Sequence, residues 1–206
     1  MTKTSLPAPT PPRGPSDHDV SVQIVEAASQ HFGLYGYEKT TVSDLAKAIG
    51  FSKAYIYKFF DSKQAIGEVI CSNRLDMIKR IVDDAISDAP SASERLRRMF
   101  KALVDASRDL FFHDRKLYDI AATSAGEAWP SSVAYEAHIR NLIAQTIREG
   151  REAGEFERKT PLDEVSNVIY LTMRPYVTPL LLQYNLDNAE EATLQLSSLI
   201  LRSLAP

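Results

Sequence analysis

Two short helical segments joined through a single glycine constrain the fold of this chain more than any other feature. The stretch that contains them, residues 40–66, reads TTVSDLAKAIGFSKAYIYKFFDSKQAI. Thr41 is a residue type that caps helices, and apolar residues follow it at helical spacing. Gly50 comes where the chain must bend, and Ser52 is placed to cap a second helix. The pattern predicts two helices that meet at a tight turn.

The second of these helices, predicted over Ser52–Phe60, carries more aromatic and cationic side chains than a small core requires. Ile56 and Phe60 lie four positions apart, so both are expected to pack inward. The others point at least partly outward: Lys53, Ala54, Tyr55, Tyr57 and Lys58. A surface of this composition suits phosphates and base edges. The alternative for Tyr55, Tyr57 and the nearby Phe59 is packing between helices.

The charge of the chain is unevenly distributed. Five lysines lie from Lys39 to Lys63 against two aspartates, a local net charge of +3 in a chain whose formal net charge is −3. A small positive patch on an acidic body addresses phosphates without making the whole protein adhere to nucleic acid. A non-specific nucleoid-type protein is the less favoured alternative, because it predicts a more basic chain.

Nearly all of the chain after residue 16 has helical signals, and no alternating strand pattern occurs. Ser91–Glu94 forms a capping box, and Thr160 followed by Pro161 is a helix start. A long helix is predicted from Ser62 to about Ser87, and two further helices over about 161–184 and 188–204. We expect an all-α fold of about nine helices, in which a three-helix head precedes a helical bundle.

The domain organisation follows from composition. Residues 1–16 are Pro-rich and polar, so we predict a disordered arm, with DNA contacts from Lys3 and Arg13 as the alternative. Residues 17–63 form the predicted head, and residues 64–206 are far more than such a head requires.

The single cysteine supports neither a disulfide framework nor a metal cluster, which fits a reducing compartment. No run approaches the roughly 18–20 apolar residues of a membrane span, and the N-terminus has no signal-peptide centre. We therefore expect a cytoplasmic protein that needs no cofactor or metal and does not enter a membrane.

The segment GYEKTTVSDLAKAIGFSKAYIYKFFDSKQAI resembles the DNA-binding signature of the TetR/AcrR family of bacterial transcriptional regulators. The match covers about thirty contiguous residues, and GREAGEFE at residues 150–157 is also similar to a loop late in such chains. The matching positions are Gly36, Tyr37, Thr40, Thr41, Val42, Asp44, Leu45, Ala46, Gly50, Ser52, Ile56, Tyr57, Phe60, Lys63 and Ile66.

The resemblance implies roles for nine residues: Thr41, Ser43, Lys53, Ala54, Tyr55, Tyr57, Lys58, Phe59 and Lys63. Thr41 and Lys63 would hold the DNA backbone, and Tyr57 a phosphate or sugar edge. Lys53, Ala54, Tyr55 and Lys58 match positions that usually reach bases, with Ser43 as a helper. Three positions depart from the family pattern: Ala54 replaces a common Gly, Tyr55 a small polar residue, and Phe59 a His or Tyr.

The resemblance also implies that residues 64–206 bind a small-molecule effector and form a homodimer on double-stranded operator DNA. The final two helices are the expected dimer surface, where Leu196, Leu199, Ile200 and Leu204 make an apolar stripe. The alternative is an ordinary core face.

The effector pocket is expected beside the prolines of YLTMRPYVTPLLLQY, because Pro175 and Pro179 kink a helix. The candidate lining residues are Phe100, Leu103, Phe111, His113, Tyr118, Trp129, Met173, Arg174 and Tyr176. We expect a mainly apolar or aromatic ligand with one polar group held by Arg174 or His113. Core packing is the alternative for each residue. Since the long helix leaves the head, a ligand against Ile78–Ala85 would move it as a lever.

A helical enzyme is the remaining alternative. Dimetal carboxylate chemistry needs Glu-x-x-His pairs, whereas the chain offers only Glu136-x-His138. No nucleophile turn of the form G-x-S-x-G is present. The sequence therefore predicts a ligand-responsive DNA-binding regulator, most simply a repressor, and not an enzyme.

Overall fold

The structure is a computed structural model that describes residues 17–206. These residues contain ten α-helices, one 3-10 turn and no strand, so the expected all-α fold is confirmed. The elements are α1 (Asp17–Tyr35), α2 (Val42–Ile49), α3 (Lys53–Ile56), α4 (Lys63–Ile86), α5 (Ala92–His113), α6 (Arg115–Gly126), α7 (Pro130–Glu152), α8 (Leu162–Val177), α9 (Pro179–Leu182), η1 (Leu186–Asn188) and α10 (Ala189–Ser203). The Pro-rich arm predicted over 1–16 lies outside the described residues.

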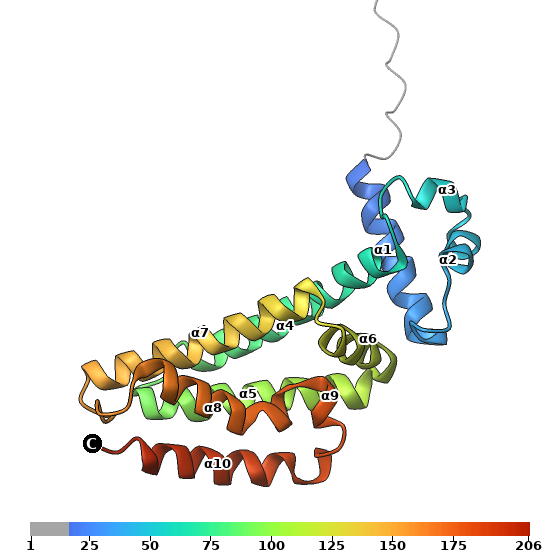
Figure 1. The fold of residues 1–206 in the computed structure, drawn as a ribbon. Coiled ribbons are helices and arrows are strands. Elements are labelled where there is room, and N and C mark those ends of the chain that lie inside the picture. Colours follow the sequence, from blue (N-terminus) through green and yellow to red (C-terminus); the bar gives the residue numbers. More distant parts are fainter. Residues whose placement is uncertain (1–16) are drawn as a thin grey trace, which may run out of the picture.

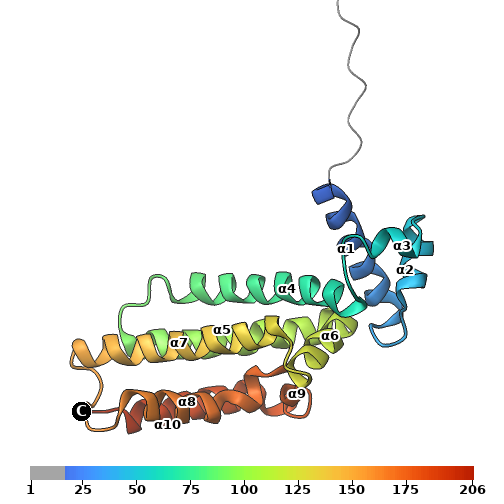
Figure 2. The same cartoon turned by 45° about the horizontal axis from the view of Figure 1, so that its top comes forward.

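The helices form a small head and an elongated body. Helices α1–α3 make the head at one end, and α4 leaves the head and runs along the body (Figure 1). Figure 2 shows the body in layers, with α4 outermost, α5 and α7 next, and α8 with α10 on the far side. Within residues 17–206, no helix combines the length and hydropathy that crossing a bilayer requires.

The head has its own core, but that core does not end at residue 63. Phe32, Leu45 and Ile56 are at most 1% exposed, and they pack with Ile66 of α4 and Trp129 at the start of α7. Because α4 and α6 contribute to this core, the head is physically fused to the neighbouring end of the body. A second core of apolar side chains from α4, α5, α7, α8 and α10 fills the body.

The structure corrects two element boundaries and adds one for which the sequence analysis made no prediction. The helix expected over Ser52–Phe60 has only the four residues of α3, and the chain continues as a turn to Phe59. The helix expected over 161–184 breaks at Thr178, which is extended, so Pro179 opens α9 instead of kinking α8. Helix α6 is separate from α5 because the Asp114 carboxylate caps a new start.

Candidate DNA-binding surface and effector cavity

The start of α2 is capped as its sequence predicts. The Thr41 hydroxyl accepts from the backbone N–H of Asp44, and the Asp44 carboxylate accepts from the Thr41 N–H at 2.9 Å. The Thr41 hydroxyl also lies 2.6 Å from the same carboxylate, to which it donates. The Thr41 side-chain and backbone hydrogen bonds lower the pKa of Asp44. A phosphate approaching this helix start would compete with Asp44 for the same donors.

Helix α3 presents a cationic and aromatic surface. Lys53, Ala54, Tyr57 and Lys58 are exposed, and Tyr57 keeps 42% of its surface accessible. The Lys53 ammonium lies 5.7 Å from the centre of the Tyr57 ring. Ser52 caps the helix by accepting from the Tyr55 N–H at 3.1 Å. This short, capped helix and the turn that follows it therefore direct two lysines and one tyrosine away from the core.

Tyr55 and Phe59 occupy a different position from the exposed residues of α3. Both are half-buried against the head core. The Tyr55 ring packs edge-on against Phe51 at 5.0 Å and against Phe59 at 5.3 Å, forming a row of three aromatic rings. The three rings pack between α3 and the head core, so only part of the Tyr55 ring is accessible to a ligand. Ser43 of α2 is also half-buried.

Lys63 already has partners inside the protein. Its ammonium donates to the Tyr37 carbonyl at 3.0 Å and lies 4.1 Å above the Tyr37 ring. The side chain thus ties the start of α4 to the turn between α1 and α2. Since an ammonium has three donors, a phosphate contact remains compatible with this position.

The head lysines lack carboxylate partners. Among residues 17–206, every ion pair lies in the body, beyond Asn73. Lys53 and Lys58 are therefore free of the charge neutralisation seen in the body, for example between Arg95 and Glu149 at 2.5 Å. Unpaired cations of this kind are suited to neutralising DNA phosphates, a contact that releases counterions.

Trp129 joins the head to the body. Its ring is 2% exposed and packs edge-on against Tyr37 at 5.5 Å. A Cβ placed on Gly67 of α4 would lie 3.1 Å from carbons of both the Trp129 and Tyr37 rings, so the three residues are in close contact. A displacement of the α6–α7 turn, which holds Trp129, would therefore change the contacts of Trp129 with Gly67 and Tyr37 in the head core.

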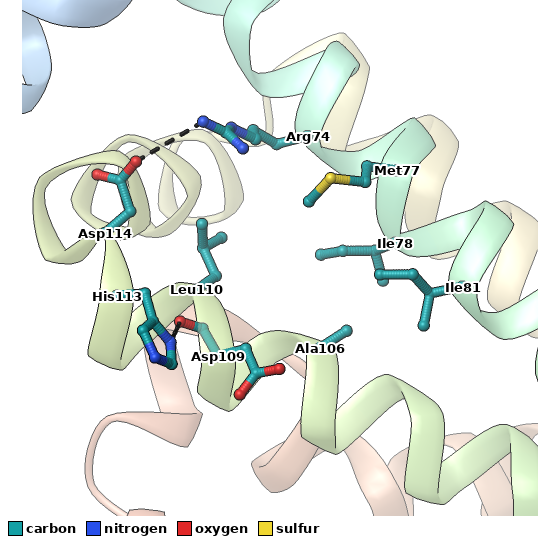
Figure 3. Close-up of a pocket in the computed structure, with 9 residues that line it drawn as sticks. All are labelled: Arg74, Met77, Ile78, Ile81, Ala106, Asp109, Leu110, His113 and Asp114. Carbon is teal, nitrogen blue, oxygen red and sulfur yellow. Dashed lines mark hydrogen bonds and ion pairs between the residues drawn. The ribbon is translucent and has the colours of Figure 1, made fainter.

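An open cavity of about 300 Å³ lies between α4 and α5. Figure 3 shows Met77, Ile78 and Ile81 of α4 facing Ala106 and Leu110 of α5. The polar residues gather at one end: Arg74, Asp109, His113 and Asp114. Arg74 reaches across the cavity to Asp114 at 3.7 Å, a weak and partly exposed ion pair. The volume matches the small end of ligand-binding pockets.

Most of the ligand-binding residues expected from sequence do not line this cavity. His113 does, whereas Phe100, Leu103, Trp129 and Met173 are at most 2% exposed and fill the cores. Phe111 and Tyr176 are half-buried against the body core, and the buried Tyr118 borders only a void of about 20 Å³. In this structure these side chains follow the core-packing alternative, because large apolar side chains on amphipathic helices pack inward first. Arg174 lines a separate cavity, discussed below.

Six cavity residues were missed by sequence reasoning: Arg74, Met77, Ala106, Asp109, Leu110 and Asp114. The lever hypothesis did place a ligand near Ile78–Ala85, and Ile78 and Ile81 do line the cavity. The sequence signal that could have found Met77 is its place beside Ile81 on the outward face of the long helix α4. Met77 and Ile81 are 43% and 42% exposed there. Exposed apolar residues on a helix that faces another helix indicate an incompletely filled groove.

The expected dimer stripe is divided between two faces of α10. Ile200 and Leu204 are 6% and 1% exposed and belong to the chain's own core, which corrects their assignment to a dimer surface. Leu196 is half-buried, and Leu199 is 55% exposed. Helix α10 packs on α5 and α8, so one face of it must close the body. The apolar residues that remain exposed on α8 and α10 are Val168, Leu171, Leu194 and Leu199.

The fold and the surface of α3 define a class: a helix-turn-helix DNA-binding protein with an all-helical body. A sequence profile described as bacterial regulatory proteins, tetR family, matches residues 24–69, and one described as tetracyclin repressor-like, C-terminal domain, matches residues 92–196. The chain belongs to the TetR family of bacterial transcriptional regulators, which bind operator DNA, act as dimers and are often ligand-responsive. The members of this family are transcriptional regulators and not enzymes.

Individual relatives agree with this placement. The HTH-type transcriptional regulator YhgD of Bacillus subtilis (strain 168) is 30% identical over 133 residues, covering 62% of this chain and 69% of YhgD. The negative transcriptional regulator IcaR of the Staphylococcus aureus biofilm operon icaADBC is 35% identical over 60 residues, 29% of this chain and 32% of IcaR. The structure of the fatty acid degradation regulator FadR from Bacillus halodurans shares the fold, with a TM-score of 0.66, 20% identity and coverage of 92% and 96%.

Proposed function

We propose that this protein is a ligand-responsive repressor that binds a palindromic operator as a homodimer and leaves it when a small, mainly apolar or aromatic molecule binds. One observation carries the proposal: α4 begins inside the head core and also forms one wall of the cavity beside Ile78 and Ile81. A single rigid helix therefore spans both sites. The similarity to IcaR, a negative regulator, supports repression.

On the DNA side, Lys53, Ala54 and Lys58 face the major groove, since α3 and the turn after it direct them outward, and the exposed Tyr57 contacts a phosphate or sugar edge. Thr41 and Lys63 contact the phosphate backbone near the helix starts, and Ser43 of α2 assists the base-reading residues. Tyr55 and Phe59 mainly hold α3 in place from beneath. In a dimer the two α3 helices must lie about 34–36 Å apart, one duplex turn, to enter successive major grooves.

On the effector side, a ligand between α4 and α5 moves the two helices apart and shifts the end of α4 that lies in the head. The ligand favours release from DNA only if it binds the conformation with displaced α4 more tightly than the DNA-bound conformation. Typical allosteric coupling of about 1–3 kcal/mol would weaken operator binding roughly 5- to 150-fold. Arg74, Asp109, Asp114 and His113 place polar groups only at one end, so the rest of the ligand is apolar.

The test is an operator titration with and without a panel of aromatic and medium-chain aliphatic molecules. Ala106→Phe fills the cavity from α5 and should abolish the response while DNA binding persists. Ala137→Phe, at an exposed position of α7, is the matched control and should respond like wild type. A filled variant that still responds would place the effector elsewhere, and a wild type that responds to nothing in the panel would argue against the ligand switch.

A further inference from the structure

A second cavity lies on the α7–α8 side of the body and shares no lining residue with the cavity between α4 and α5. It is open to the surface and has a volume of about 100 Å³, and its lining includes Ala128, Ser132, Tyr135, Glu136 and Arg174. We propose that this cavity binds a small carboxylate on a compact apolar body, with Arg174 pairing the charge and the Tyr135 hydroxyl donating a hydrogen bond.

The charges around this cavity favour an anion. Glu136 is already neutralised, because Arg140 donates to its carboxylate at 3.0 Å. Arg140 is in turn held by Asn167 at 2.9 Å and stacks over the Tyr170 ring at 3.8 Å. Among the described residues, no ion pair involves the Arg174 guanidinium. Arg174 therefore leaves one uncompensated positive charge at the cavity, suited to a planar carboxylate.

Tyr135 supplies an independent reason to expect a ligand. Its hydroxyl is inaccessible to solvent and has no hydrogen-bond partner among residues 17–206. Buried hydroxyl groups almost always have a partner, so an unpaired one at a cavity calls for a bound group. Burial raises the pKa of Tyr135 well above its ordinary value, so the phenol stays protonated and acts as a donor. The remaining wall, including Val133, Ile139 and Val177, is apolar.

The cavity adjoins the turn that touches the head. Ala128, which lines it, is the one described non-glycine residue with a positive φ, at 53°. Ser132, also in the lining, donates to the carbonyl of Trp129 at 2.9 Å. Trp129 contacts Gly67 and Tyr37. A carboxylate in the cavity would therefore press on the strained Ala128 turn and alter the contact between Trp129 and the head. This regulatory consequence rests on the proposed function, whereas the binding does not.

The binding test uses benzoate as the probe and benzamide as its uncharged match. Titration calorimetry measures the affinity, and the fluorescence of Trp129, the only tryptophan of the chain, reports a ligand beside its turn. Wild type should bind benzoate at least roughly tenfold more tightly than benzamide, because a charge-assisted pair is the stronger contact. Equal affinities, or no benzoate binding at millimolar concentration, would overturn the proposal.

The variants assign the contact. Arg174→Gln should weaken benzoate binding roughly tenfold or more, and Tyr135→Phe several-fold, while Arg148→Gln, an exposed arginine of α7, should match wild type. Tyr135→Phe removes only an unpaired hydroxyl, so it keeps the fold and decides the question if Arg174→Gln does not fold. Benzoate affinity unchanged in either variant would refute the site. Benzoate binding that leaves operator affinity unaltered would refute the regulatory consequence alone, and the Ala106→Phe result is independent of both.

Discussion

The head and the body of this regulator differ in whether their charged side chains form ion pairs within the protein. In the head, Lys53 of α3 and Lys58 of the following turn have no carboxylate partner, and their ammonium groups lie 5.7 and 5.5 Å from the centres of tyrosine rings. In the body, Arg98 bridges Asp88 at 2.7 Å and Glu94 at 2.9 Å, and Arg151 lies 3.6 Å from Glu157. Many charges in the body are paired internally, with Arg174 as an exception, whereas the lysines of the head are left for a partner.

The two regions also differ in how they bury their apolar side chains. The head closes a small core with a few residues from each short helix and borrows α4, α6 and Trp129 to complete it. The body has a larger core of its own and leaves several cavities, among them the one between α4 and α5 and the one beside α7 and α8. The difference teaches that the head is specialised for an external surface, and the body for internal space that a ligand can enter.

The largest effect is expected from a body substitution that disables the head. Leu199→Glu puts a charge on an exposed apolar position of α10, so each chain should fold but the dimer should dissociate. Because one head alone holds one half-site, operator affinity should fall at least about 100-fold. Light scattering and an operator titration measure both. Phe112→Glu, also at an exposed apolar position, is the control, and a stable Leu199→Glu dimer would place the interface elsewhere.

Gly150 in the body and Gly33 in the head differ in how closely other atoms surround them. A Cβ on Gly150 of α7 would overlap the Phe156 ring and lie 2.9 Å from the Ala92 Cβ. Gly150→Ala should therefore destabilise the protein by about 1–3 kcal/mol. Gly33 lies within α1 with nothing within 4 Å of the corresponding Cβ, so Gly33→Ala should stabilise it by up to about 1 kcal/mol. Urea unfolding of both variants checks this, and equal shifts in one direction would contradict it.

The unpaired lysines of α3 predict a loss of specificity. Lys53→Ala should weaken binding to the operator more than binding to random DNA, by about 1–3 kcal/mol. Lys159→Ala, an exposed lysine between α7 and α8, should change neither. Binding assays on both DNAs at one salt concentration make the comparison. Equal losses on the two DNAs would mean that Lys53 contacts only the backbone.

The smallest effect tests whether Lys63 serves both the head and the DNA. Lys63→Ala should reduce the slope of log affinity against log salt by about one unit per half-site, without a change in sequence preference. The variant should also lose roughly 1 kcal/mol of stability, because the hydrogen bond to the Tyr37 carbonyl disappears. If stability falls while the slope stays the same, Lys63 is only an internal tie.

Local sequence was sufficient for the caps and the bend of the head, although not for the length of α3. The Thr41 cap, the Gly50 bend with φ of 71° and the Ser52 cap each depend on a few neighbouring residues, and all three lie where the sequence predicts them. Capping and turn preferences act over three or four residues, so a single chain reveals them. The family could be predicted for the same reason, because its signature is contiguous.

Tertiary packing alone decided the rest. An apolar stripe such as Leu196, Leu199, Ile200 and Leu204 indicates a buried face, but only the position of α10 against α5 and α8 assigns Ile200 to the chain's own core and leaves Leu199 exposed. Likewise, Met173 and Arg174 are adjacent in sequence, yet one fills the core and the other lines a cavity. A cavity is the space that packed helices fail to fill, and that space depends on the relative placement of distant segments, which local periodicity does not encode.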